Sequence, residues 1–168
     1  LAAALLWSII QTETDGKEMK HPAALNLPVN LRSFFESETL ANFFAVINIS
    51  WSERRAPESF SEVLEAVSRQ MDEQIVKERL EETISYNVSN EKKWYVRAIP
   101  LFIKHLAMEL IFLRTSRAHT MTFSNIGPAK IREDLRENVE DFELLVGASP
   151  KQRMKCGAVA YDGKLCLA

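Results

Sequence analysis

Side chains that commonly act as general bases near neutral pH are sparse in this sequence, which contains three histidines. His21 precedes a proline at a strand entry, His105 falls on the polar face of a helical segment, and His119 stands just before another strand. We interpret all three as surface residues, with His119 the only one close to a candidate site. No Ser-His-Asp arrangement is apparent, and the five glycines form no phosphate-binding loop. The sequence therefore predicts no catalytic residue in this chain.

A serine and an asparagine end one strand-like segment, at Ser124-Asn125-Ile126-Gly127. Two hydrogen-bonding side chains at a strand end can contribute to a cleft. They can equally close the turn through local backbone bonds, with Gly127 supplying a free φ angle. The residues alone favour the turn.

Arg32 follows a buried strand in Pro28-Val29-Asn30-Leu31-Arg32. An arginine at this place can hold loop carbonyls or a carboxylate, or it can bind a substrate, and the structural role is favoured. The paired carboxylates Glu81-Glu82 and Glu133-Asp134 lie in charge-rich segments. Because nothing apolar surrounds them to raise a pKa, we interpret them as surface residues.

Two cysteines, Cys156 and Cys166, flank Asp162-Gly163, a strong signal for a two-residue hairpin. The simplest register places Val159 opposite Cys166, so the two cysteines point to opposite faces. We therefore expect no disulfide and, by default, a reducing cytoplasmic compartment. Without histidines nearby, a zinc site is not expected either.

The composition is that of one globular domain covering residues 1–168. Hydrophobic residues make up 46% and charged residues 26%, and the formal net charge is −2. No basic stripe is present, so a nucleic-acid partner is not expected. The apolar stretch 94–113 carries charged residues on one face, which predicts an amphipathic helix on a core and not a membrane span. The apolar start 1–10 is too short to span a bilayer and reads as the end of a buried helix.

Hydrophobic periodicity predicts the elements of the first half. Residues 25–31 alternate as a strand with one buried face, in which Pro28 should lie at an edge or bulge, and the denser run 43–49 predicts a strand covered on both faces. Ser59 and Glu62 form a capping box that begins a helix reaching Ile75.

In the second half, residues 84–93 read as a polar connection, followed by a helix that is bent or begins near Pro100. The short strands predicted after it are 120–124, which should stop at 125–128, then 142–146, 156–161 and 164–167. This order predicts an α/β (α+β) fold, a mixed sheet with helices packed on it. Both apolar ends suggest cuts through a larger protein.

Several motifs resemble the bacterial alcohol acetyltransferase-like proteins, which share a superfamily with condensation domains and chloramphenicol acetyltransferases. The resemblance runs in the family's order from residue 1 to residue 168, and its motifs are Pro28-Val29-Asn30-Leu31-Arg32, Ser37-Glu38-Thr39-Leu40, Asn42-Phe43-Phe44, Ile84-Ser85-Tyr86-Asn87-Val88, the segment around Pro100, Thr122-Phe123-Ser124-Asn125-Ile126-Gly127, Phe142 to Gly147 and Cys156 to Tyr161.

The resemblance implies the C-terminal lobe of a two-lobed acyltransferase whose reaction occurs in a tunnel between the lobes. A His-His-x-x-x-Asp-Gly motif in the N-terminal lobe would supply the base, and this chain lacks that motif, so we expect no activity from it alone. Ser124, Asn125 and Gly127 would lie on the tunnel wall and position the thioester or oxyanion. Arg32 and Asn42 would be structural.

The same resemblance implies the substrates and partners. The donor is a coenzyme A or acyl-carrier thioester with acetyl as the expected acyl group, the acceptor is an alcohol, and no cofactor or metal is bound. The N-terminal lobe of the same protein is the expected partner. An isolated lobe should self-associate through its exposed inter-lobe face. The alternative is a non-catalytic interaction module derived from the same fold.

Overall fold

The computed structural model describes residues 1–14, 18–19, 21–116, 119–147 and 154–168. The elements along this part of the chain are α1 (Ala2–Thr14), β1 (Ala23–Asn30), the 3₁₀ turn η1 (Leu31–Ser33), β2 (Phe44–Trp51), α2 (Phe60–Gln74), α3 (Lys77–Lys92), α4 (Trp94–Ala98), α5 (Leu101–Ser116), β3 (Met121–Pro128), the 3₁₀ turn η2 (Glu133–Asn138), β4 (Met154–Tyr161) and β5 (Lys164–Leu167).

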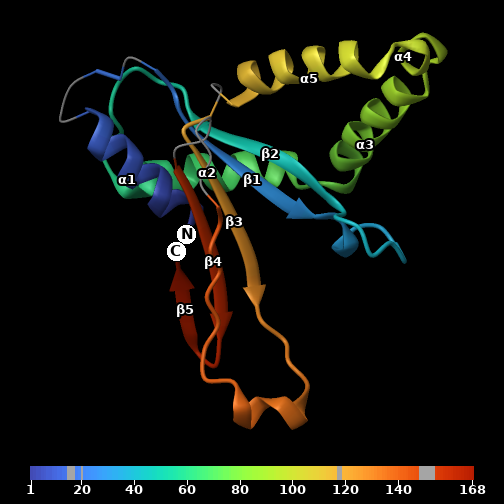
Figure 1. Ribbon diagram of the computed structural model, residues 1–168. Helices are drawn as coiled ribbons and strands as arrows, with labels where there is room; N and C mark the ends of the chain where they lie inside the picture. Colours follow the sequence, from blue (N-terminus) through green and yellow to red (C-terminus); the bar gives the residue numbers. More distant parts are fainter. Residues whose placement is uncertain (15–17, 20, 117–118, 148–153) are drawn as a thin grey trace.

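These strands form one mixed sheet in the spatial order β2-β1-β3-β4-β5 (Figure 1). β1 pairs with β2 antiparallel and with β3 in parallel; β3 pairs with β4 in parallel, and β4 with β5 antiparallel. No helix in the described ranges is long and apolar enough to cross a membrane. The predicted mixed sheet with helices packed on it is confirmed.

The core lies between the sheet and two helices, α1 and α2, which cover one face (Figure 1). We call this the near face and the opposite one the far face. Successive strand residues alternate between the faces, so every second side chain of β1 and β2 enters the core. Leu25 and Ile49 are fully buried there beside Leu6 and Ile10 of α1, which confirms the predicted buried N-terminal helix.

The first two strands confirm one prediction and correct another. β1 has the predicted buried face, and Pro28 lies beyond the two residue pairs that join β1 to β3, so its missing N–H removes no bond of that ladder. β2 was expected to be covered on both faces, and this is wrong. It is an edge strand on which Phe44 and Val46 stay exposed on the far face.

The predicted cap of α2 forms with one change of partner. The Ser59 hydroxyl accepts from the Glu62 backbone N–H at 3.4 Å, as a capping serine should. The Glu62 carboxylate accepts from the N–H of Glu58, not from that of Ser59, and also pairs with Arg55. The side-chain hydrogen bond from Arg55 lowers the pKa of Glu62. The helix start was therefore predicted correctly, and the reciprocal bond was placed one residue too late.

Residues 84–93 are not a connection, since residues 84–92 form the second half of α3. The sequence analysis missed this helix because its apolar contacts lie near its start. Leu80 is buried against Leu31 and Ala45, and Ile84 packs beside them one turn later, whereas most of the described side chains beyond Ile84 are exposed. The helix does break at Pro100, where α4 ends and α5 begins, as predicted.

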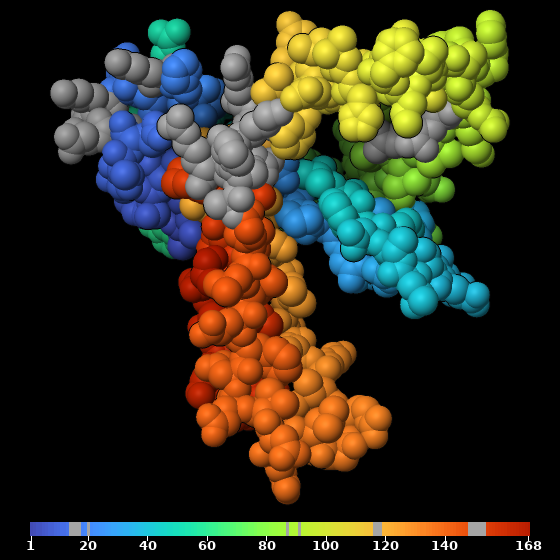
Figure 2. All heavy atoms as spheres, in the orientation of Figure 1, coloured from blue at the N-terminus to red at the C-terminus, as the bar shows by residue number. Residues whose placement is uncertain are grey.

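α5 does not lie on the core as an amphipathic helix, which corrects that expectation. None of its side chains that the structure describes is buried. In Figure 1, α3, α4 and α5 form an arm that leaves the sheet, and in Figure 2 the yellow and amber atoms of α5 form a separate ridge above β2. A helix that is apolar around most of its circumference normally lies buried. α5 therefore presents an apolar surface that nothing in the described chain covers.

The C-terminal strands confirm the predicted hairpin and correct two boundaries. Val159 pairs with Cys166, and the turn residues Asp162 and Gly163 both have positive φ angles, as the two-residue turn requires. Cys156 and Cys166 are free thiols. β3 does not end before residues 125–128 but includes them and ends at Pro128, and β4 begins at Met154 and not at Cys156.

Residues 142–146 were predicted to be a strand, and this is wrong. Both edges of β4 are already paired, with β3 and β5, so this segment cannot pair with β4. It instead crosses the far face of β4, where Leu144 lies over Gly157 and the ring of Phe142 packs edge-on against Tyr161 with centroids 5.0 Å apart.

Candidate functional site

The end of β3 is positioned by a divergence of two strands. β1 and β3 pair only at Leu25 with Met121 and at Asn26 with Thr122, whereas β3 stays paired with β4 as far as Pro128. Beyond Thr122 the edge of β3 that faces β1 is therefore open. The ends of α1 and α2 lie over this opening on the near face.

Ser124 and Asn125, which were expected to act from one wall, lie on opposite faces of the sheet. Asn125 shares the near face with Phe123, a member of the core cluster. Ser124 shares the far face with Thr122 and is half-buried. The cause is the alternation of side chains along a strand, which the bulge after Asn125 does not alter for these two residues. The structure does not bring them together in one site.

A β-bulge follows Asn125. Asn125 pairs with Ala158 and Gly127 with Val159, so Ile126 is the extra residue. Gly127 has a φ of +77°, a left-handed conformation that favours glycine. Its N–H donates to the Asn125 Oδ1 at 3.0 Å. This is the local bond that the turn interpretation predicts.

That bond also orients the Asn125 amide. Because the Gly127 N–H can only donate, the atom that it meets must be the carbonyl oxygen of the side chain. The Asn125 NH₂ group is then left with no hydrogen-bond partner among the described residues. The bulge therefore presents a fixed two-proton donor.

A cavity of about 290 Å³ adjoins Asn125 on the near face. Apart from Asn125, its lining is apolar and comes from α1, α2 and the three strands β1, β2 and β3; it consists of Leu1, Ala2, Leu27, Pro28, Val29, Ile47, Met71, Ile75 and Phe123. An apolar hollow with one placed polar group is typical of a small-molecule site. Sequence reasoning missed the cavity, because its walls are distant in the chain.

The far face carries a polar row that the sequence reading also missed. Register pairs place Asn48 beside Asn26, Asn26 beside Thr122, and Thr122 beside Lys155. The Lys155 Nζ donates to the Gly147 carbonyl at 2.7 Å. The Thr122 hydroxyl is buried without a hydrogen-bond partner among the described residues. Ser124 lies next to this row and not at the cavity.

Arg32 holds the loop that follows η1. Its Nη2 donates to the carbonyl oxygens of Thr39 at 2.9 Å and Ala41 at 2.8 Å. These contacts are the ones that a structural role requires, and both lie far along the chain from β3. Asn42 is exposed, and its side chain has no hydrogen-bond partner among the described residues.

Two of the histidines line one cavity, although they are far apart in the sequence. His21 and His119 border a hollow of about 270 Å³ together with Glu13 and Thr120. Burial lowers the pKa of His119, and a hydrogen bond with the Thr115 backbone opposes that shift. His105 is exposed on α5. Among the residues that the structure describes, no three ligand-type side chains are grouped closely enough to hold a metal ion.

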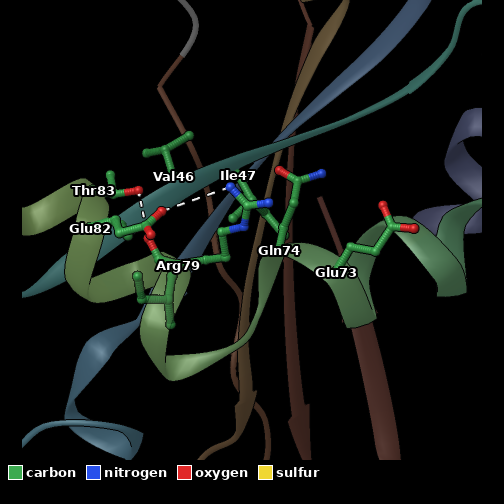
Figure 3. A pocket seen from close by; sticks show the side chains of 9 residues that line it. Val46, Ile47, Glu73, Gln74, Arg79, Glu82 and Thr83 are labelled. Atoms are coloured by element: carbon green, nitrogen blue, oxygen red, sulfur yellow. Dashed lines mark hydrogen bonds and ion pairs between the residues drawn. The ribbon is translucent and has the colours of Figure 1, made fainter.

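A further hollow of about 290 Å³ lies at the junction of α2 and α3 (Figure 3). Arg79 is its only cationic lining residue, and its Nη1 lies 3.8 Å from the Glu82 carboxylate. The Thr83 hydroxyl donates to the Arg79 carbonyl at 3.0 Å. Since the guanidinium is already paired and both side chains are exposed, we interpret this hollow as a solvated helix junction.

Comparisons with known proteins add no assignment to this geometry: no family model, no curated protein and no solved structure matches the chain.

Proposed function

We propose that this chain is the C-terminal half of an O-acyltransferase, which transfers an acyl group from a thioester to an alcohol. The observation that supports this best is the free amide donor of Asn125 at the rim of an apolar cavity. An acyl thioester has the matching form, an apolar chain that ends in a carbonyl. Coenzyme A and a carrier protein are both donors that fit this proposal.

The proposed reaction needs a base that this chain does not supply. A histidine of the N-terminal lobe removes the proton of the alcohol, whose oxygen attacks the thioester carbonyl. The carbonyl π electrons move to oxygen and form a tetrahedral oxyanion. The C–S bond then breaks, the ester carbonyl is restored, and the thiolate takes up a proton. A donor aimed at the developing oxyanion, the role assigned to Asn125, stabilises the transition state.

The uncovered surface of α5 supports the proposal that a partner lobe packs against this chain. Its largest exposed side chains include Leu106, Met108 and Leu110, each more than half exposed. Apolar patches of this kind on a folded domain usually mark an interface. In this proposal the N-terminal lobe covers α5, and copies of the isolated chain associate through the same surface.

The test has two stages. The intact mass of the protein from its native source should exceed 19.2 kDa, the mass of these residues. That longer protein should then release thiol from acetyl-CoA in the presence of an alcohol. Asn125→Asp should lower kcat about 100-fold, because it keeps the acceptor for Gly127 and removes the donor. Asn138→Asp, on exposed η2, is the matched control. Full turnover by Asn125→Asp would exclude the proposed role.

A non-catalytic interaction module is the second candidate, and the surface of α5 favours it as well. A native mass equal to 19.2 kDa, together with no thioester turnover, would select this candidate. The apolar ridge of α5 would then be the surface on which to search for a bound protein.

A further inference from the structure

We propose that the cavity beside Asn125 binds the hydrocarbon chain of a medium-length acyl donor, so that the preferred donor carries more than an acetyl group. This inference rests on the proposed function, because it takes a thioester as the ligand. It adds the class of acyl group and assigns its binding to the near face of this lobe.

The size of the cavity supports a single chain. Its volume of about 290 Å³ is at the lower end of the roughly 300–1,000 Å³ typical of small-molecule sites. An acetyl methyl group would leave most of this space empty, and empty apolar space loses the dispersion contacts that a bound chain would make. A branched or aromatic ligand of drug size would exceed it.

The chemistry of the lining supports a hydrocarbon. Nine of the ten lining residues have apolar side chains, and none of the ten side chains is charged. Asn125 is the exception, and it offers a donor because its oxygen is occupied by Gly127. One donor and an otherwise apolar wall suit a chain with a single carbonyl at its end. A carboxylate is a poorer match, because no side chain in the lining carries a positive charge that could pair with it.

The experiment measures binding to the 168-residue chain by calorimetry, with the acetyl, butanoyl, hexanoyl and octanoyl thioesters of N-acetylcysteamine. Affinity should rise about fourfold for each methylene that enters the cavity, since burying one methylene contributes about 0.8 kcal/mol. The rise should stop when the cavity is full. Equal affinity for all four thioesters would overturn the inference.

Matched variants locate the site. Ala2→Phe fills the cavity from the first turn of α1, and Ile75→Phe fills it from the end of α2. Either should remove the dependence on chain length, whereas Ala4→Phe, on the exposed side of α1, should keep it. Far-ultraviolet circular dichroism establishes that each variant is folded. If both filling variants are folded and their affinity still depends on acyl-chain length as before, the hydrocarbon binds elsewhere and the inference is overturned.

Asn125→Asp tests the carbonyl end separately. It should weaken the binding of all four thioesters by a similar factor, about two- to tenfold, and leave the gain in affinity per methylene unchanged. Because binding requires no turnover, the two proposals can fail independently. A steep chain-length dependence without any acyl transfer by the two-lobed protein would retain the cavity assignment and reject the enzyme. Acyl transfer with equal efficiency from all four donors would support the enzyme and reject the cavity assignment.

Discussion

Gly157 of β4 lies directly beneath Leu144: a Cβ built on Gly157 would stand 2.5 Å from the Leu144 carbonyl oxygen and 2.8 Å from its Cγ. Real Cβ atoms do not approach backbone oxygens this closely. The contact keeps the segment 139–147 against the far face of the sheet, where the Tyr161 hydroxyl also donates to the Val139 carbonyl at 3.2 Å. A glycine in the middle of a strand often marks such a close approach.

Gly157→Ala should therefore destabilise the protein by about 1–3 kcal/mol, because either the segment or the strand must shift. The measurement is the free energy of unfolding in urea. Gly147→Ala is the matched control, since nothing lies within 4 Å of a Cβ at that position. Equal stability of the two variants would show that the segment 139–147 does not pack on β4.

Arg32→Ala should loosen the loop between η1 and β2. It removes the donors to the carbonyl oxygens of Thr39 and Ala41, two of the hydrogen bonds that hold this loop. The loss of stability should be about 1 kcal/mol, because the bonds are exposed to solvent. Limited proteolysis should cut between residues 33 and 43 faster than in the unmodified chain. Arg69→Ala, at an exposed position on α2, should leave that cleavage rate unchanged.

Stability should fall on mild acidification through His119. Burial lowers its pKa, so the folded protein holds the neutral imidazole more strongly than the unfolded chain does. The stabilisation is complete above the unfolded value of 6.5 and is lost as the pH falls below it toward the folded value. The urea midpoint of the unmodified chain should thus drop between about pH 7.5 and about pH 5.5.

His119→Gln should reduce that drop, because the side chain then has no proton to bind. The same substitution at His105 on exposed α5 controls for the loss of one histidine. Glu62 acts in a separate window: its pKa is lowered, so its contribution is lost only below the ordinary value of 4.5. A drop of the same size in His119→Gln would contradict this assignment.

Self-association of the isolated chain should depend on α5. Leu106 and Leu110 lie one turn apart and are 62% and 59% exposed. Replacing both by glutamate should convert concentration-dependent oligomers to monomers, as measured by light scattering. The unfolding free energy of the monomer should change little, since neither side chain contributes to the core clusters. An unmodified chain that stays monomeric at high concentration would contradict the prediction.

The candidate site could be predicted only in part. The residue types at the end of β3 predicted a local backbone bond from the asparagine and a free φ angle at Gly127, and the bond from the Gly127 N–H to Asn125 spans two residues. The cavity was not predictable, because Leu1, Ile75 and Asn125 come from three separate parts of the chain. Ser124 was grouped with Asn125 because they are neighbours, although strand alternation sends them to opposite faces.

Features that depend on near neighbours could be predicted from the residues alone. These are the alternation of β1, the start of α2 at Ser59, the break at Pro100 and the hairpin at Asp162-Gly163. In each of these features, the interacting residues lie within a few positions of one another, so local propensity is enough to specify the conformation.

The tertiary structure decided which segments find a partner. Residues 142–146 are mostly apolar, as a buried strand can be, but they do not pair with β4, because β3 and β5 already occupy both of its edges. Phe44 and Val46 of β2 are apolar yet exposed on the far face, and α5 is apolar yet uncovered in the described chain. The hydrophobic periodicity of a segment specifies which side chains share a face. Whether another element packs against that face depends on contacts between residues far apart in the chain.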